Sequence, residues 1–325
     1  MLFQYIKKRL KPFFEHRLKD FTIQEINPKF NELKNNLSEI SRNQEYLKNL
    51  LTLTVDITNL PKSVGILRDI QLVSFSILKK FDQICRKNQL RYWLDYGTLL
   101  GTIRHKGFIP WDDDLDVSMP IKDYKIFKSI ANEELKNSPF SFIDVPSQIV
   151  KIVHKEFMPK TEEEYSKFIF WQMKEKLFFA LDIFPYYPAK SRESAEFLLK
   201  NACDLKSAIF NKFSSFNDFN QADIHVKNAA AKFLPSENNA NFLCQGAESR
   251  VYQPVIRSIN DIYPLKEARF ESGYFFVPNH PENILTDLYG DYMQFPKDIC
   301  PHHLFINELN RDELKKIKKA AYESI

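Results

Sequence analysis

Hydrophobic residues recur at helical spacing in the first part of the chain. Between residues 28 and 54 the spacing alternates strictly between three and four positions, as in a coiled coil, with one polar residue at an a position: Phe30, Leu33, Leu37, Ile40, Gln44, Leu47 and Leu51. Asn27 and Pro28 form a favourable helix start. The pattern predicts a helix through which copies of the chain form a homo-oligomer. The alternative is a long helix whose apolar stripe packs on the rest of the protein.

A second helical pattern covers residues 64–89, and strand-like stretches follow it. Alternating or aromatic stretches predict strands at 91–95, 115–117, 141–145, 149–153 and 177–184, helices at 122–135, 193–213 and 282–288, and a strand or hairpin at 271–277. Residues 214–262 show mainly helix and loop patterns. This mixture predicts an α/β (α+β) domain with a modest sheet over residues 61–325, preceded by a helical extension over residues 1–60.

Charge is distributed unevenly along the chain. The first 20 residues hold six basic and two acidic side chains, whereas the other 305 residues hold 40 of each sign. Residues 1–19 therefore have the pattern of a basic amphipathic helix that contacts an anionic membrane surface. A helix docked on the protein or a frayed terminus is the alternative. The balanced remainder gives no general electrostatic basis for nucleic-acid binding.

Glycine and cysteine usage narrow the function classes. The chain has 7 glycines and contains neither G-x-G-x-x-G nor G-x-x-x-x-G-K-[ST], which argues against a dinucleotide-binding Rossmann unit and a P-loop NTPase. Four scattered cysteines without a C-x-x-C pair argue against a disulfide scaffold or a four-ligand zinc site. No apolar run approaches the roughly 20 residues that span a bilayer, and no secretory signal is present. We expect a cytoplasmic protein, held peripherally on the inner face of the cytoplasmic membrane where residues 1–19 bind lipid.

Four aspartates lie within five positions. They are Asp112, Asp113, Asp114 and Asp116. If this run is a strand, alternation places Asp112, Asp114 and Asp116 on one face and turns Asp113 away. Clustered carboxylates suit hard cations such as Mg²⁺ or Mn²⁺, which prefer oxygen ligands and leave positions for a substrate phosphate. A solvated acidic turn or a calcium-stabilised loop is the alternative, and the apolar residues around the run argue against it.

Small and basic residues come shortly before the acids. Gly97-Thr98 follows a predicted strand and allows the backbone, with its N–H groups and a hydroxyl, to approach a phosphate. A diphosphate held by a metal needs cationic donors on its other side. The alternatives are a structural role for Arg104 beside an aspartate and a surface position for His105. The candidate substrate-binding residues are Tyr96, Gly97, Thr98, Arg104, His105 and Lys106.

One further acid, Asp182, lies in the apolar stretch 177–184. A buried lone carboxylate is costly and needs a metal, a base or a hydrogen-bond network. We expect Asp182 to complete the metal site.

In these segments the sequence resembles the LicD family. The resemblance rests on residues 94–116, on Leu181-Asp-Ile-Phe-Pro185, on Val277-Pro278 and on Tyr289-Gly-Asp-Tyr-Met293 with Pro296. Members transfer phosphocholine or related alcohol phosphates from a CDP-activated donor to a cell-surface glycan. Fukutin and fukutin-related protein, which are CDP-ribitol-dependent transferases, are similar in the same region.

The resemblance implies a nucleotidyltransferase-like mixed sheet flanked by helices, with a Gly-Ser/Thr turn and strand-borne acids that hold Mg²⁺. Carried over, Gly97-Thr98 is the turn, and the metal-binding and catalytic acids are Asp112, Asp114, Asp116 and Asp182. The implied partners are a CDP-activated alcohol and a glycan acceptor, and the implied product is CMP. One of the acids takes the proton of the attacking hydroxyl, with Asp116 as a candidate.

Three other functions fit parts of the pattern. Asp112-Asp113-x-x-Asp116 matches the aspartate-rich motif of prenyl-diphosphate enzymes, but that motif needs a helix, and Pro110 with the alternation after Leu115 favours a strand. A nucleotidyltransferase that releases pyrophosphate keeps the same fold. A non-catalytic oligomeric scaffold with a vestigial site is the third alternative.

Overall fold

The computed structural model describes residues 31–32, 34–36, 38–47, 49–144, 149–158, 179–210, 239–247, 253–296 and 309–323. Its internal contacts divide the chain into two compact units. One comprises Met1–Asp56 with Gln294–Asp298, and the other comprises Ile57–Met293 with Ile299–Ile325. No helix in the described ranges has both the length and the apolar character needed to cross a lipid bilayer.

In the first unit, the described residues between 31 and 54 are helical, as their spacing predicts. The association of this helix into a coiled coil stays a prediction. Residues 1–19, the predicted membrane-binding segment, lie outside the described residues.

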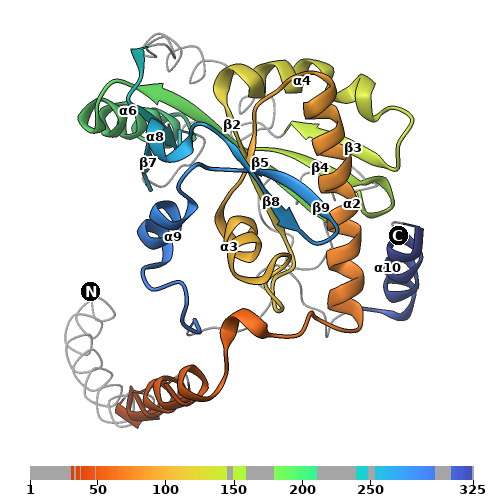
Figure 1. Cartoon of the computed structure of the whole chain (residues 1–325), viewed down its shortest axis with the longest axis vertical. Coiled ribbons are helices and arrows are strands. Elements are labelled where there is room, and N and C mark those ends of the chain that lie inside the picture. Colours follow the sequence, from red (N-terminus) through yellow and green to blue (C-terminus); the bar gives the residue numbers. More distant parts are fainter. Residues whose placement is uncertain are drawn as a thin grey trace, which may run out of the picture. The chain divides into compact units, whose positions relative to one another are not determined.

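The second unit is built on a mixed sheet, which confirms the expected fold class (Figure 1). Its seven strands in the described residues are β1 (Trp93–Leu94), β2 (Leu115–Pro120), β3 (Phe140–Asp144), β4 (Val150–His154), β5 (Ala180–Ala189), β6 (Phe242–Gln245) and β7 (Val255–Ser258). The order is β1-β2-β5-β4-β3, and β6 joins β5 to β7. Only the central β2–β5 pair is parallel among these described strands, so its connection through α4, β3 and β4 is long.

Two helices cover one face of the sheet. They are α2 (Ile66–Lys87) and α4 (Ile121–Leu135), and the rings of Phe81 and Phe127 meet between them at a centroid distance of 5.2 Å. Leu115 and Val117 of β2 belong to the same buried core. The short helix α10 (Arg311–Glu323) packs on α2 (Figure 1). Because side chains alternate along a strand, the remaining β2 residues face the opposite side.

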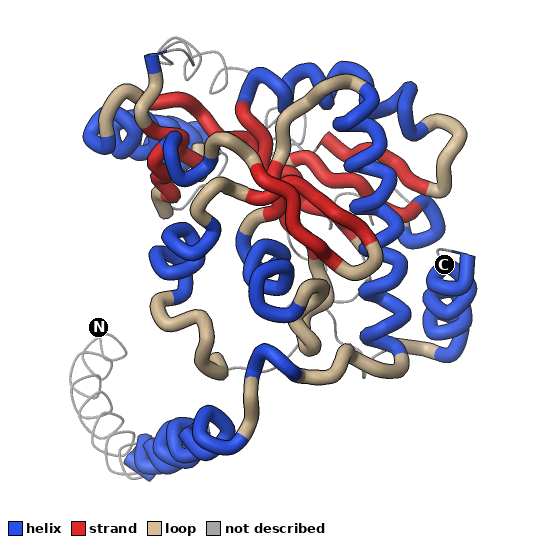
Figure 2. Tube along the Cα trace, viewed as in Figure 1, coloured by secondary structure: helices blue, strands red, loops and turns tan. Residues whose placement is uncertain are grey.

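Shorter elements cover that opposite side. These are α3 (Tyr96–His105), which contacts β2, and α9 (Pro281–Tyr289), which contacts α3 (Figure 2). A hairpin of β8 (Lys266–Phe270) and β9 (Gly273–Val277) contacts the edge strand β1 and α3, and its phenylalanines pack on Phe75 of α2. The other described elements are η1 (Ile57–Asn59), η2 (Lys155–Phe157), α6 (Arg192–Phe210), which packs on β5, β6 and β7, and α8 (Ile259–Ile262).

Three sequence expectations were wrong. No helix was expected at α3, where glycines interrupt the pattern. Strands β6 and β7 lie in a region where mainly helix and loop were expected, because four-residue strands show little alternation. Strand β5 does not end at Pro185 but continues to Ala189. Along β5, the pairing with β4 stops at Ile183 and the pairing with β6 starts at Tyr187. Pro185, which has no N–H to donate, lies in the gap between these two antiparallel partners.

Candidate active site

The acidic run lies where the chain enters β2. Asp112, Asp113 and Asp114 form the loop before the strand, and Asp116 is its second residue. One carboxylate oxygen from each of the three loop acids lies within 4.8 Å of the others. The alternation argument therefore does not apply to the loop acids, and Asp113, expected to point away, belongs to the group that can hold a cation.

Strand register brings Asp182 beside Asp116. The parallel pairing sets Asp116 of β2 directly beside Asp182 of β5. Directly paired residues share a face, so both carboxylates lie on the side covered by α3. The sequence pointed to both acids, but their adjacency comes from a pairing between strands more than 60 residues apart.

The acids raise one another's pKa. Burial raises the pKa of Asp112, and Asp114 and Asp113 raise it further. Burial likewise raises the pKa of Asp116, with added effects of Asp114 and Asp182. A bound cation stabilises such a group, because it offsets the repulsion between ionised carboxylates. A set of ligands that are all oxygens fits Mg²⁺ or Mn²⁺. The residues present therefore fit the expected metal.

Asp182 has a cationic partner within the protein. Lys151 of β4 is paired with Asp182 in register, and its Nζ contacts both carboxylate oxygens, with Oδ2 at 2.5 Å. This lysine was not a sequence candidate. The only local signal was its position as the one charged residue in an apolar strand. Lys151 places a positive charge beside the acids on the sheet face.

The N-terminus of α3 is fastened to β2 by a buried acid that the sequence did not single out. Asp95 accepts hydrogen bonds from the N–H of Tyr96 at 2.9 Å, from Ser118 Oγ at 2.7 Å and from the Tyr186 hydroxyl at 3.1 Å. Its own N–H donates to the carbonyl of Asp116 at 3.1 Å. Asp95 therefore ties the start of α3 to the strand that carries the acids.

The Gly97-Thr98 turn lies at the acids, but its hydroxyl is already used. Thr98 Oγ1 accepts the N–H of Asp116 at 2.8 Å, and it is buried. Gly97 lies so close to the loop that a Cβ there would stand 2.8 Å from Asp112 Oδ2. The ring of Tyr96 contacts that of Phe184 at a tilt of 55°, with 5.1 Å between the centroids. The turn thus shapes the acid loop through protein contacts.

The three basic candidate residues at the end of α3 differ in their burial and in their hydrogen-bond partners. Arg104 is buried, donates from Nη1 to the carbonyl of Tyr292 and from Nε to His105 Nε2, and burial lowers its pKa to about 10. Burial and Arg104 lower the pKa of His105 to about 4, so its ring is neutral at pH 7. Lys106 is exposed and donates to the carbonyl of Ile103 at 3.1 Å. Arg104 therefore braces the segment after α9, and Lys106 caps its own helix.

The charges of the acids act on Tyr289, the last residue of α9. This residue is 44% exposed, and partial burial together with Asp116, Asp95 and Asp112 raises its pKa. The sequence placed this tyrosine in the resembling segment 289–293 without giving it a role.

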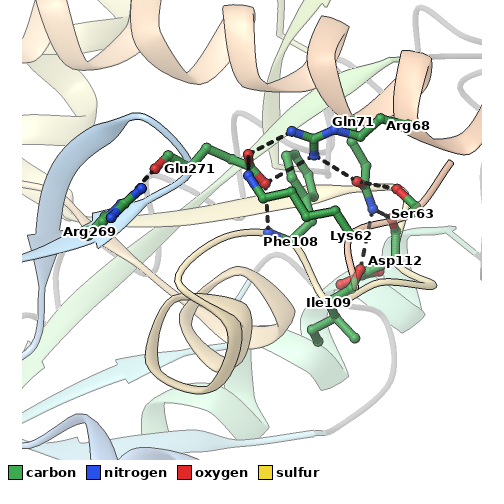
Figure 3. Close-up of polar contacts among 9 residues, drawn as sticks. All are labelled: Lys62, Ser63, Arg68, Gln71, Phe108, Ile109, Asp112, Arg269 and Glu271. Atoms are coloured by element: carbon green, nitrogen blue, oxygen red, sulfur yellow. Dashed lines mark hydrogen bonds and ion pairs between the residues drawn. The ribbon is translucent and has the colours of Figure 1, made fainter. Parts of the chain in front are cut away.

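A buried ion-pair network holds the loop that leads to the acids (Figure 3). Glu271, at the tip of the β8–β9 hairpin, is 5% exposed and accepts two hydrogen bonds from Arg68 of α2, at 3.0 and 2.7 Å. It also accepts from Lys62 Nζ at 2.5 Å and from the N–H of Phe108 at 3.4 Å. The hairpin, α2 and the loop after α3 are thereby joined.

The same network reaches the first acid. Gln71 of α2 accepts from Arg68 at 3.1 Å and from Ser63 at 2.6 Å through its Oε1. Its Nε2 donates to the carbonyl of Asp112 at 2.8 Å and to that of Ile109 at 3.3 Å (Figure 3). The position of the acid loop therefore depends on residues far from it in sequence, which no local pattern revealed.

Comparisons with known proteins agree with this architecture. A family model described as LicD/FKTN/FKRP, nucleotidyltransferase domain, matches residues 89–226. The lipopolysaccharide cholinephosphotransferase LicD of Haemophilus influenzae is 31% identical over 265 residues, which cover 73% of this chain and 96% of that protein. The human ribitol 5-phosphate transferase FKRP is 50% identical over 34 residues, 10% of this chain and 7% of that protein.

A further match, over 60 residues, is to a yeast protein. Mannosyltransferase regulator 4 of Saccharomyces cerevisiae is 33% identical over 60 residues, 18% of this chain and 5% of that protein. The similarity to the Haemophilus protein, in contrast, extends over most of both chains. Together with the family match over residues 89–226, it shows that this chain belongs to the LicD family.

Proposed function

We propose that this chain transfers an alcohol phosphate, phosphocholine or a related group, from a CDP-activated alcohol to a hydroxyl of a cell-surface glycan. The glycan is of the lipopolysaccharide, capsule or teichoic-acid type, and CMP is released. The observation that carries this proposal is that the three loop acids lead directly into β2, where Asp116 lies beside Asp182 of β5, in a chain whose relative over most of its length is a cholinephosphotransferase.

The acids supply the metal site in this proposal. Asp112, Asp114, Asp116 and Asp182 would hold Mg²⁺ or Mn²⁺, and Asp113 joins the candidates because of its place in the loop cluster. The bound cation would neutralise charge on the diphosphate of the donor. Lys151 adds a positive charge beside Asp182.

The reaction is an in-line displacement at the phosphorus that bears the alcohol. The oxygen of the acceptor hydroxyl forms a bond to this phosphorus, and the bond from phosphorus to the bridging oxygen breaks. The bridging oxygen leaves as part of CMP, and one carboxylate of the cluster, with Asp116 as our candidate, takes the hydroxyl proton. The protein contributes mainly positioning and charge stabilisation, which the rigid attachment of α3 and the acid loop supports.

Product analysis with a panel of donors tests the proposal. The full chain is incubated in Mg²⁺ with CDP-choline, CDP-ethanolamine, CDP-ribitol or CDP-glycerol and a glycan acceptor, and the released nucleotide is identified. We expect CMP with one of these donors. Asp114→Ala and Asp182→Ala should abolish its release, and unchanged turnover in either variant would show that the metal site is assigned wrongly.

The same assay separates the alternatives. Pyrophosphate release from CTP and an alcohol phosphate would identify a nucleotidyltransferase that attacks the α-phosphorus. Absence of metal-dependent CDP binding would identify a non-catalytic scaffold. We also propose that residues 1–19 contact an anionic membrane, which flotation with phosphatidylglycerol vesicles and with neutral phosphatidylcholine vesicles would test.

A further inference from the structure

A buried arginine shares the sheet face with the acids. Arg257 of β7 pairs with Leu243 of β6, which pairs with Pro188 of β5. Residues of β5 alternate between faces, so Pro188 lies on the same side as Asp182, and directly paired residues share a side. Arg257 therefore projects from the face that carries the acids.

The guanidinium of Arg257 has unused hydrogen-bond donors. The residue is 5% exposed, and its Nε and Nη2 atoms are buried without a hydrogen-bond partner among the described residues. These two N–H groups form one edge of the planar guanidinium, a fork that matches two oxygens of a phosphate. Nη1 lies 3.6 Å from Asp287 Oδ2, beyond hydrogen-bond distance, and Asp287 is 67% exposed. A permanent charge buried this deeply normally has a closer partner.

Two tyrosines connect this arginine to the acids. The Tyr96 hydroxyl donates to Gln245 of β6, which lies on the same face as Leu243, at 2.6 Å, and the Tyr186 hydroxyl donates to Asp95 at 3.1 Å. Burial raises the pKa of Tyr96 and of Tyr186, and the charge of Arg257 acts against this rise at both hydroxyls.

We propose that the Nε and Nη2 edge of Arg257 binds two oxygens of the donor's diphosphate. The identity of the donor rests on the proposed function, whereas the fork itself calls for an anion with two oxygens. Arg257 thereby takes the role expected of Arg104 and Lys106. Arg104 donates to the carbonyl of Tyr292, and Lys106 is exposed at the end of α3.

Calorimetry of the full chain in Mg²⁺ with CDP, pyrophosphate and cytidine tests the assignment. Arg257→Gln should weaken the binding of CDP and pyrophosphate about 10- to 100-fold, as the loss of a charge-assisted bidentate contact does. Cytidine carries no phosphate, and its binding should not change. Arg257→Lys keeps the positive charge but not the two parallel donors, so it should give an intermediate loss of affinity for CDP and pyrophosphate. This variant replaces Arg257→Gln in the test if the glutamine variant does not fold.

Asp287→Asn is the matched control. It removes the nearest carboxylate, so CDP affinity should stay equal or rise. Thermal unfolding shows whether Arg257 serves ligand binding or a structural ion pair with Asp287. Because Arg257 has no close partner in the described residues, Arg257→Gln should unfold at the wild-type temperature or above.

The outcomes distinguish this site from the proposed function. Unchanged CDP and pyrophosphate affinity in Arg257→Gln would overturn the assignment, as would an equal loss of unfolding temperature in Arg257→Gln and Asp287→Asn without a loss of affinity. Arg257-dependent binding of pyrophosphate, without binding of CDP or cytidine, would support the anion site and reject the CDP donor. A wild-type chain that binds none of the three probes would reject both.

Discussion

At the scale of single residues, Gly97 keeps the first acid in place. A Cβ at this position would lie 2.8 Å from Asp112 Oδ2, at the end of a side chain that can rotate away. Gly97→Ala should therefore fold with a loss of stability of about 1 kcal/mol or less. The proposed Mg²⁺-dependent release of CMP should fall by about tenfold or more, because a displaced carboxylate would no longer meet the proposed cation in the same geometry. Denaturant unfolding and the donor assay measure the two effects.

Gly101→Ala is the contrasting control for this prediction. Its Cβ would stand 2.4 Å from the carbonyl oxygen of Gly107 and 3.2 Å from the N–H nitrogen of Ile109, and backbone cannot rotate away. We expect a loss of about 2 kcal/mol or more. Equal stability of Gly97→Ala and Gly101→Ala would contradict the distinction between side-chain and backbone neighbours.

The charges of the acids give a second prediction at this scale. Asp116 lies beside Asp182 and near the loop acids, and its pKa is raised by burial and by Asp114. Asp116→Asn removes this repulsion, so the metal-free variant should unfold at a higher temperature than the wild type. Added Mg²⁺ should raise the wild-type unfolding temperature more than that of the variant. The exposed acid Glu133 is the control, and Glu133→Gln should respond to Mg²⁺ as the wild type does.

At the scale of elements, β2 and α3 show what a sequence can and cannot reveal. The acids were recognisable because four carboxylates in five positions are chemically unusual wherever they lie. Their arrangement was not recognisable, because β2 begins only at Leu115 and because strand register alone sets Asp116 beside Asp182. The periodicity of long helices is a local property, and α2 and α4 were predicted within a few residues. Arg257 shares the sheet face of Asp182, and Glu271 holds the acid loop, through pairings that no local pattern encodes.

The β8–β9 hairpin stabilises the acid loop through one carboxylate, Glu271. Burial by itself raises the pKa of Glu271, but hydrogen bonds from Arg68 and Lys62 outweigh burial and leave the pKa below its ordinary value of 4.5. Glu271→Gln should lower the free energy of unfolding by about 2 kcal/mol at pH 7, because it leaves Arg68 without its bidentate partner. The loop should also loosen through Gln71, which donates to the carbonyl of Asp112.

The difference in unfolding free energy between the wild type and Glu271→Gln should change with pH in one direction. A carboxyl group with a lowered pKa in the folded state contributes stability above its unfolded pKa, and that contribution is lost as the pH falls through the folded pKa. The difference between wild type and Glu271→Gln should therefore be constant near neutral pH and shrink below pH 4.5. Urea unfolding at several pH values measures it, and a difference that grew on acidification would contradict the ion-pair assignment.

At the scale of the whole molecule, we propose that the N-terminal helix joins copies of the chain. Ile40 and Leu47, both on the predicted seam, are 53% and 55% exposed in the structure of one chain. Buried lysines at seam positions are strongly unfavourable, so Ile40→Lys with Leu47→Lys should convert an oligomer into a monomer in sedimentation velocity. Ser38→Lys with Asn49→Lys adds the same charge on the outer side of the helix and should leave the oligomer intact. Because the helix belongs to a different compact unit from the acids, CMP release by the monomeric variant should match the wild type. A monomeric wild type, or equal dissociation of both variants, would show that the seam does not hold copies of the chain together.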